Sequence, residues 1–213
     1  MNTKLLNSKI LNFEKQFDPY LISSLGMVLD LTKSKDNKSW LDTYLASNAI
    51  HRQHVLEFYK YISNGELTDK VRMHDMDKIF SSKAYMYAFA VRFNLSKNKI
   101  SLNSILSKMN MLNTTIEKDT ETLISKAVEI HRTTQAHHAE AYGSKQYLMK
   151  DEDILEAVAD WLAVALEIGS DPSVWFKTQC ESEAFYFGSK TKYVEKLIKK
   201  GEVLLYGLRQ QSI

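Results

Sequence analysis

Apolar residues recur along most of this chain at intervals of three and four, the spacing that places them on one face of an α-helix. The longest segments of this kind are residues 19–31, 40–62, 114–134 and 151–168, with a shorter one near residues 5–13. The chain has only 7 glycines and 2 prolines, so few residues would interrupt helices. The pattern therefore predicts an all-α fold of about 7–9 helices.

The residues at the ends of these segments are typical of helix boundaries. Ser39 can cap the helix over 40–62, and Gly65 can end it. Asp151 is a candidate cap for the helix over 151–168, and Gly169 is its candidate stop. Further helices are expected from just after residue 78 to about 93, over about 104–113, over 172–188 and over 189–200, with a loop over 94–103.

A chain of 213 residues fits a single domain with a core of several packed helices. We expect this domain to span residues 1–213, with helices over 171–213 packed on an earlier core. The C-terminal segment is rich in aromatic residues, and these could form either core or the face of a homodimer, with core favoured. They are Trp175, Phe176, Phe185, Tyr186 and Phe187.

Composition narrows the class of protein. The net charge is only +2, so no charge imbalance points to a nucleic-acid partner. No apolar run is long enough to span a membrane, and the N-terminus does not resemble a secretory signal. The single cysteine, Cys180, excludes an internal disulfide framework and cysteine-rich zinc sites. A cytoplasmic setting is expected.

The stretch over residues 71–78 is the first candidate for chemistry. It contains His74-Asp75, followed by Asp77 and Lys78, and leads into the apolar residues 79–93. We interpret it as a metal-binding centre at the start of a core helix. A His-Asp pair alone is common by chance, so this interpretation depends on other ligands that converge on the pair.

The chain offers such ligands on other predicted helices. Imidazole nitrogens and carboxylate oxygens can together hold a divalent metal. Asp160 interrupts an apolar helix, where a carboxylate is costly to bury without a partner. Alternatively, Glu156 and Asp160, four residues apart, could share an exposed stripe, and each histidine could be structural. The five other histidines are His51, His54, His131, His137 and His138.

Taken in order, these residues resemble the HD-domain metal-dependent phosphohydrolases, an all-helical superfamily. The resemblance covers roughly residues 45–170 and consists of separate motifs. The same segments are similar to an uncharacterised phage and bacterial family with an HD-like pattern. The segments that carry the resemblance have the sequences HRQHV, MHDMDKIF, IHRTTQAHHAE and ILEAVADWLAVAL. The resemblance implies a single-domain helical bundle of the HD-domain type.

The resemblance also implies a ligand set. One metal would be held by His51, His74, Asp75 and Asp160. In two-metal members the aspartate of the pair bridges both ions and extra histidines hold the second, which here implies His131, His137 and His138. His54 competes with His51 for the first position, and His51 is favoured because Arg52 beside it resembles a basic residue of the uncharacterised family.

The implied activity is hydrolysis of a nucleotide or a related small phosphate ester by a metal-activated water. The resemblance gives Lys78 a contact with substrate phosphate, and Arg52 or Arg72 would add charge stabilisation. Asp75 and Asp77 would act in catalysis, Asp77 by orienting water or holding a histidine proton. Mixed nitrogen and oxygen ligands are suitable for Mn, Fe, Co, Ni or Zn, and Mg is a further candidate.

Two other functions stay open at this point. Histidine-rich relatives with two metals include di-iron oxygenases, and a non-enzymatic helical interaction or structural protein would need none of these residues. The partner of the enzyme would be a small phosphorylated substrate, with no membrane involved. The Asn- and Lys-rich composition suggests an AT-rich genome such as that of a phage, in which case the setting is the host cytoplasm.

Overall fold

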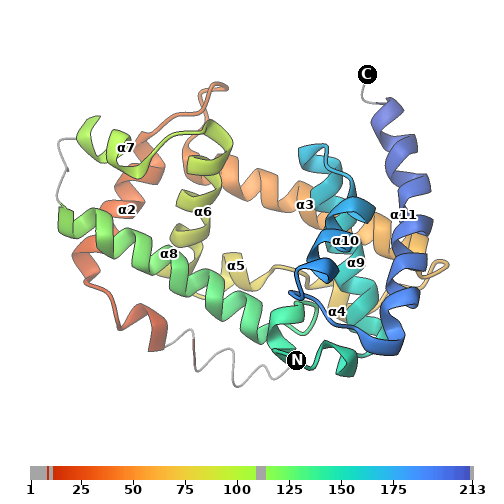
Figure 1. Ribbon diagram of the computed structural model, residues 1–213. Helices are drawn as coiled ribbons and strands as arrows, with labels where there is room; N and C mark the ends of the chain where they lie inside the picture. The colour runs from red at the N-terminus through yellow and green to blue at the C-terminus, as the bar shows by residue number, and fades with distance from the viewer. Residues whose placement is uncertain (1–8, 10–11, 109–113, 212–213) are drawn as a thin grey trace. The chain divides into compact units, whose positions relative to one another are not determined.

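The computed structural model describes residues 9, 12–108 and 114–211, and in these residues the chain is helical without strands (Figure 1). The all-α expectation is confirmed. Three short 3-10 helices accompany the α-helices: η1 Ala139–Tyr142, η2 Gln146–Leu148 and η3 Gly188–Lys190. The α-helices are α2 Pro19–Leu31, α3 Trp40–Ile62, α4 Asp69–Arg72, α5 Asp77–Phe80, α6 Lys83–Asn98, α7 Leu102–Lys108, α8 Thr114–Thr134, α9 Asp151–Ile168, α10 Pro172–Glu181 and α11 Thr191–Gln211.

Several predicted boundaries are confirmed by their capping contacts. Ser39 Oγ accepts the amide of Asp42 at 3.0 Å at the start of α3. Gly169 has a φ of 74° and ends α9 in the left-handed conformation that glycine favours. The predicted cap at Asp151 is wrong by one residue, because Lys150 occupies the cap position and Asp151 is the first residue of α9.

The segment after His74 differs from the expected single helix. The chain forms α4, a turn over residues 73–76, the one-turn helix α5 and then α6. Ser82 causes the last interruption, because its extended backbone and its side chain cap α6 at the amide of Tyr85. His74 and Asp75 therefore lie in a turn between two short helices, and the prediction that they start a long core helix is wrong.

Other boundaries also moved. Helix α6 continues to Asn98, into the first part of the predicted loop over 94–103. Within this added segment, the buried Asn94 side chain donates to the carbonyls of Trp40 and Ala90. Helix α10 ends at Glu181 rather than near residue 188, and α11 continues past residue 200 to Gln211. Most of the helix expected near residues 5–13, and residues 109–113 of the one expected after residue 103, lie outside the described residues.

The described chain forms two compact units. Unit 1 contains residues up to 48 together with 75–134, and unit 2 contains residues 49–74 and 135 onward. Helix α3 contributes to both, and the chain passes from unit 2 to unit 1 at the bond between His74 and Asp75. The expectation of one domain over 1–213 stays a prediction.

In unit 1, α6 packs against α2, α5 and α8 (Figure 1). The core includes Phe13, Trp40 and Tyr85, each with at most 2 % of its surface exposed. The ring of Tyr85 meets Phe13 edge to face, with ring centroids 5.6 Å apart. This packing fixes α6, which follows α5, the short helix that begins at Asp77.

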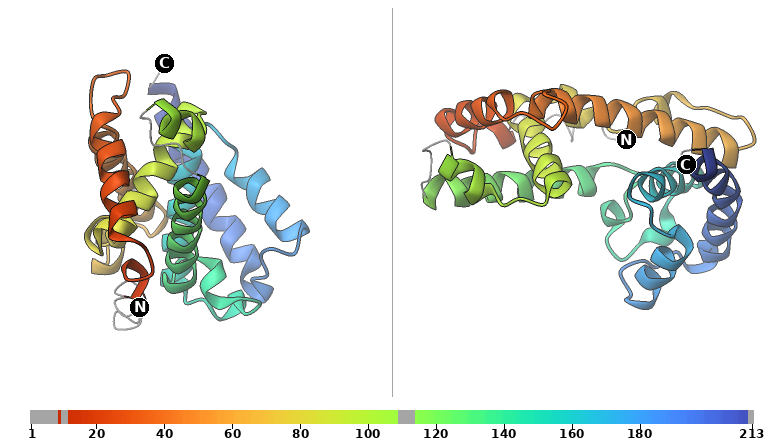
Figure 2. Two further views of the ribbon diagram at one scale, coloured as in Figure 1. Left: turned by 90° about the vertical axis from the view of Figure 1, so that its left-hand side faces the viewer. Right: turned by 90° about the horizontal axis from the view of Figure 1, so that it is seen from above.

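In unit 2, α11 lies beside α9 (Figure 2), and α10 also contacts both helices. Trp161 of α9 stacks on Phe176 and Phe185, and Phe187 closes the cluster from the edge. The C-terminal aromatic residues therefore differ in burial: Phe176 and Phe187 belong to the core, while Tyr186 is exposed. None of the helices within the described residues has the length and apolar character needed to cross a bilayer.

The contact between α9 and α11 depends on Gly201. A Cβ atom placed on Gly201 would lie 2.1 Å from Cδ1 and 3.2 Å from Cγ of Leu162, which is fully buried. Gly207, two turns later in α11, has open space around it. The two glycines therefore differ in packing although they share a helix.

We expect Gly201→Leu to lower the free energy of unfolding by about 1–3 kcal/mol, because the added side chain overpacks the contact with Leu162. Gly207→Ala should raise it by about 0.5–1 kcal/mol through helix propensity. Urea unfolding of the full chain measures both changes. A Gly201→Leu variant at least as stable as the wild type would contradict the close packing described here.

Candidate metal centre

Helix α9 carries an acidic stripe on an otherwise apolar sequence. Asp153, Glu156, Asp160 and Glu167 are spaced by three, four and seven residues, which puts them on one face. Asp153 and Glu156 expose only 4 % and 3 % of their surface. The alternative of an exposed stripe shared by Glu156 and Asp160 is therefore wrong, and these carboxylates need partners inside the protein.

Two histidines from separate segments of unit 2 meet the Asp160 carboxylate. Nε2 of His51, from α3, lies 3.1 Å from Oδ1 of Asp160, and Nε2 of His74, from the turn after α4, lies 3.7 Å from the same oxygen. Burial alone would raise the pKa of Asp160. The hydrogen bonds and charges of His51 and His74 outweigh that effect and lower this pKa well below its usual range.

Carboxylates of the same helix hold the opposite nitrogens of both rings. Nδ1 of His51 lies 3.0 Å from Oε1 of Glu167, and Nδ1 of His74 lies 3.1 Å from Oε1 of Glu156. A ring whose Nδ1 donates to a carboxylate presents the Nε2 lone pair on its other side. Nδ1 of His54 also contacts Oε1 of Glu167, at 3.1 Å. It is His51 that turns Nε2 toward Asp160.

The three ligand atoms have the spacing of a metal site. One nitrogen each from His51 and His74 and one oxygen from Asp160 all lie within 4.8 Å of one another. Ligands about 2.1 Å from a zinc ion at tetrahedral angles are about 3.4 Å apart, and the two distances to Oδ1 lie on either side of this value. A neutral imidazole lone pair facing a carboxylate oxygen is repulsive unless a proton or a cation lies between them. The residues present therefore fit a divalent cation.

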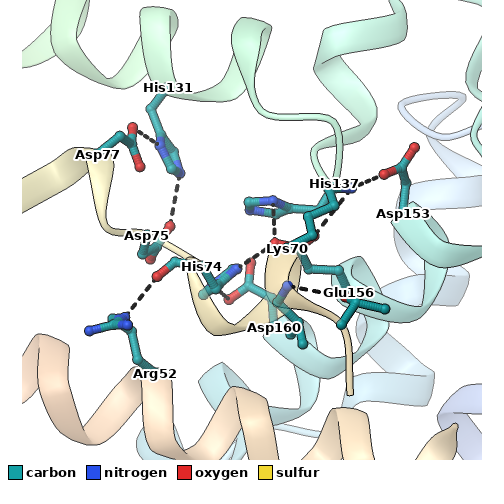
Figure 3. A network of polar contacts seen from close by, with 12 residues as sticks. Arg52, Lys70, His74, Asp75, Asp77, His131, His137, Asp153, Glu156 and Asp160 are labelled. Atoms are coloured by element: carbon teal, nitrogen blue, oxygen red, sulfur yellow. Dashed lines mark hydrogen bonds and ion pairs between the residues drawn. The ribbon is translucent and has the colours of Figure 1, made fainter. Parts of the chain in front are cut away.

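A second network supports the buried end of the stripe (Figure 3). Glu156 Oε1 also receives Nδ1 of His137 at 3.0 Å, and Lys70 Nζ lies 3.3 Å from its Oε2. Lys70 is paired with Asp153 as well, and the hydroxyl of Tyr142 donates to Asp153 at 3.0 Å. Burial would raise the pKa of Glu156, but the hydrogen bonds of His137 and His74 lower it. Burial and the charge of His74 lower the pKa of His137.

Arg52 holds the turn that carries His74. Its Nε donates to the carbonyl of His74 at 2.9 Å, and its Nη2 donates to the carbonyl of Arg72 at 2.8 Å. Figure 3 shows the first of these bonds. Two of the five guanidinium donors are thus used on main-chain groups. The side chain of Arg72 is exposed. The substrate contacts expected for Arg52 and Arg72 stay predictions.

Unit 1 holds a polar cluster around His131 of α8. Nδ1 of His131 lies 2.9 Å from Asp77 Oδ2, and Nε2 lies 3.3 Å from Asp75 Oδ1 (Figure 3). Lys78 Nζ pairs with Asp75 Oδ2 at 2.5 Å, and the hydroxyl of Tyr85 donates to Asp77 at 3.2 Å. Asp75, Asp77 and His131 form a further group whose ligand atoms could hold a cation.

The backbone and the charges of this cluster are unusual. Asp75 has a φ of 57°, the left-handed region that aspartate tolerates better than most residues. Burial would raise the pKa of Asp77, but the charge and hydrogen bond of His131 lower it. Burial and the negative charge of Asp77 raise the pKa of Tyr85 above its usual range. The phenol therefore stays protonated and acts as a donor to Asp77.

The expected ligands are divided between the two units. His51, His74 and Asp160 come together in unit 2, whereas Asp75 belongs with His131 in unit 1. Of the histidines expected at a second metal, His137 and His138 belong to unit 2, with ring centroids 4.4 Å apart. The roles of Asp75, His131, His137 and His138 as metal ligands stay predictions.

Sequence reasoning missed the residues that support the histidines: Lys70, Asp153, Glu156 and Glu167. A signal for three of them was present. An acidic residue recurs on one face of α9 while its other core positions are apolar, and such a stripe needs buried donors. Lys70 gave no such signal, because only the fold brings it to α9.

A family model described as DUF5662, a family of unknown function, matches residues 42–200, well over half of the chain. The chain belongs to this family. The DUF5662 segment contains every residue of both polar clusters, from His51 to Glu167. No curated protein and no solved structure matches the chain. The resemblance to HD-domain proteins stays a prediction.

We expect Lys70→Ala to lower the free energy of unfolding by about 3 kcal/mol, because Asp153 and Glu156 would then lie buried without their shared cation. Lys150→Ala is the matched control, since Lys150 is exposed and its Nζ lies 4.0 Å from Oε1 of Glu152, which is also exposed. That change should stay within about 0.5 kcal/mol. Urea unfolding followed by circular dichroism compares the two, and similar losses would show that Lys70 is not a buried counter-charge.

Proposed function

We propose that this protein is a metal-dependent phosphohydrolase of the HD-domain kind, acting on a nucleotide or a related small phosphate ester. One observation carries the metal site: Nε2 of His51 and of His74 face Asp160, while glutamates hold the opposite nitrogens. This carboxylate–histidine arrangement orients ligands in metal sites. The substrate class rests on the resemblance of the ordered motif.

The chain's own residues would prepare the site as follows. Glu167 and Glu156 keep Nδ1 of His51 and His74 protonated, so both rings offer a neutral Nε2. The pKa of Asp160 lies well below its usual range, so the carboxylate is ionised at neutral pH and would supply the oxygen ligand. A divalent cation bound there would lower the pKa of a coordinated water and polarise a phosphoryl oxygen.

Asp75 and its neighbours complete the proposal. Asp75 follows His74 directly in the chain, and the resemblance gives it a metal-binding role. Asp77 holds Nδ1 of His131 and could accept a proton through that ring. Lys78, with Arg52 and Arg72, would contact the phosphate. The expected cytoplasmic setting belongs to the same proposal.

We expect the purified protein to bind divalent metal, measured by elemental analysis after dialysis and by titration with Zn²⁺ and Mn²⁺. His51→Ala, His74→Ala and Asp160→Ala should each weaken binding at least about tenfold, because each removes a proposed ligand. His54→Ala is the matched control on the same helix and should leave binding unchanged. Loss of binding in the His54 variant alone would reverse the assignment of these two histidines.

We expect hydrolysis of at least one nucleotide in a phosphate-release screen. Chelation should abolish it and added Mn²⁺, Co²⁺ or Zn²⁺ should restore it, while Asp160→Asn should lower kcat/KM at least about a hundredfold. Iron-dependent oxygen uptake without phosphate release would instead identify a di-iron oxygenase. Absence of bound divalent metal would contradict the proposal and favour a non-enzymatic helical protein.

A further inference from the structure

Glu156 is a buried carboxylate on which two histidines converge. Nδ1 of His74 and Nδ1 of His137 lie 3.1 and 3.0 Å from the same oxygen, Oε1. The ring centroids of the two histidines are 4.6 Å apart, with 48° between the ring planes. His137 follows α8, whereas His74 lies in the turn after α4. One side chain of α9 therefore ties together two segments distant in sequence.

Hydrogen-bond chemistry restricts the protonation of both rings. A carboxylate oxygen has two lone pairs and can accept two donors, but it cannot donate when ionised. Lys70 Nζ, 3.3 Å from Oε2, is the cation that favours the ionised form of Glu156. Each ring must therefore present an Nδ1–H to Oε1, and in a neutral ring this leaves the lone pair on Nε2.

The two carboxylates of α9 lie on opposite sides of the His74 ring. Glu156 contacts Nδ1, and Asp160, one helical turn later, faces Nε2 at 3.7 Å. A displacement of Glu156 would release the ring from the direction it needs in order to bind a metal beside Asp160. Partners of this kind affect metal affinity although they do not touch the metal.

We propose that Glu156 is a positioning residue that fixes His74 and His137 in the Nδ1–H tautomer and so prepares both rings to bind a metal through Nε2. This inference rests on the proposed metal site. It makes His137 a member of the same histidine pair in unit 2, and it gives the half-buried Lys70 a role in keeping the shared carboxylate ionised.

The tautomers can be read directly in the full-length wild-type protein. Imidazole nitrogen shifts in ¹H–¹⁵N NMR spectra distinguish Nδ1–H from Nε2–H rings, before and after titration with Zn²⁺. We expect His74 and His137 to be Nδ1–H in both conditions, with the Nε2 signals shifting on addition of Zn²⁺. A protonated Nε2 in neutral His74 or His137 would overturn the inference, and this test needs no variant at position 156.

Variants then test the link to metal affinity. Glu156→Gln should weaken the binding of Zn²⁺ and Co²⁺ about 10–100-fold and change the visible spectrum of the Co²⁺ form, because an amide can also donate to Nδ1. Glu156→Asp, which keeps a carboxylate, should recover part of the affinity. Glu152→Gln, one turn earlier on α9 and exposed, is the matched control and should bind as wild type does.

The outcomes separate this inference from the proposed function. Wild-type protein that binds neither ion would overturn the proposed function, and the inference with it. Tight wild-type binding that Glu156→Gln leaves unchanged, with the wild-type Co²⁺ spectrum, would overturn the inference alone. A variant that loses thermal stability but keeps wild-type affinity would show that Glu156 serves only to stabilise the fold.

Discussion

The burial of carboxylates on α9 is the constraint on which the organisation of unit 2 depends. Removing an ionised carboxylate from water costs several kcal/mol unless donors or cations replace the water. Asp153 and Glu156 are almost fully buried, so the fold must bring Lys70, His74 and His137 to them. The buried carboxylates of α9 therefore require these polar partners for stability, and His74 is at the same time a residue of the candidate metal site.

The same contacts that solve this problem also select one direction for each ring. Glutamates at Nδ1 place the lone pair of each neutral ring on Nε2, and Nε2 of both rings faces Asp160. The carboxylates on one face of α9 therefore both stabilise the fold and orient the histidine ligands. The hydrogen bonds and charges of the two histidines also lower the pKa of Asp160.

The two residues of the His-Asp pair have different contacts in the structure. Asp75 has a left-handed backbone, and the boundary between the two units falls between His74 and Asp75. His74 contacts the carboxylates of α9, whereas Asp75 contacts His131 and Lys78. Within unit 1, His131 lies between the carboxylates of Asp75 and Asp77.

The sequence alone determined the all-α fold and both ends of α2, α3, α8 and α9, because apolar spacing and capping are local properties. It also supplied the candidate residues His51, His74 and Asp160. The acidic stripe of α9 was also readable there. Only the tertiary structure decided that His51 rather than His54 faces Asp160, that Glu156 is shared by two histidines and that Lys70 neutralises the stripe. These outcomes depend on packing between segments distant in the chain, and no local pattern encodes such packing.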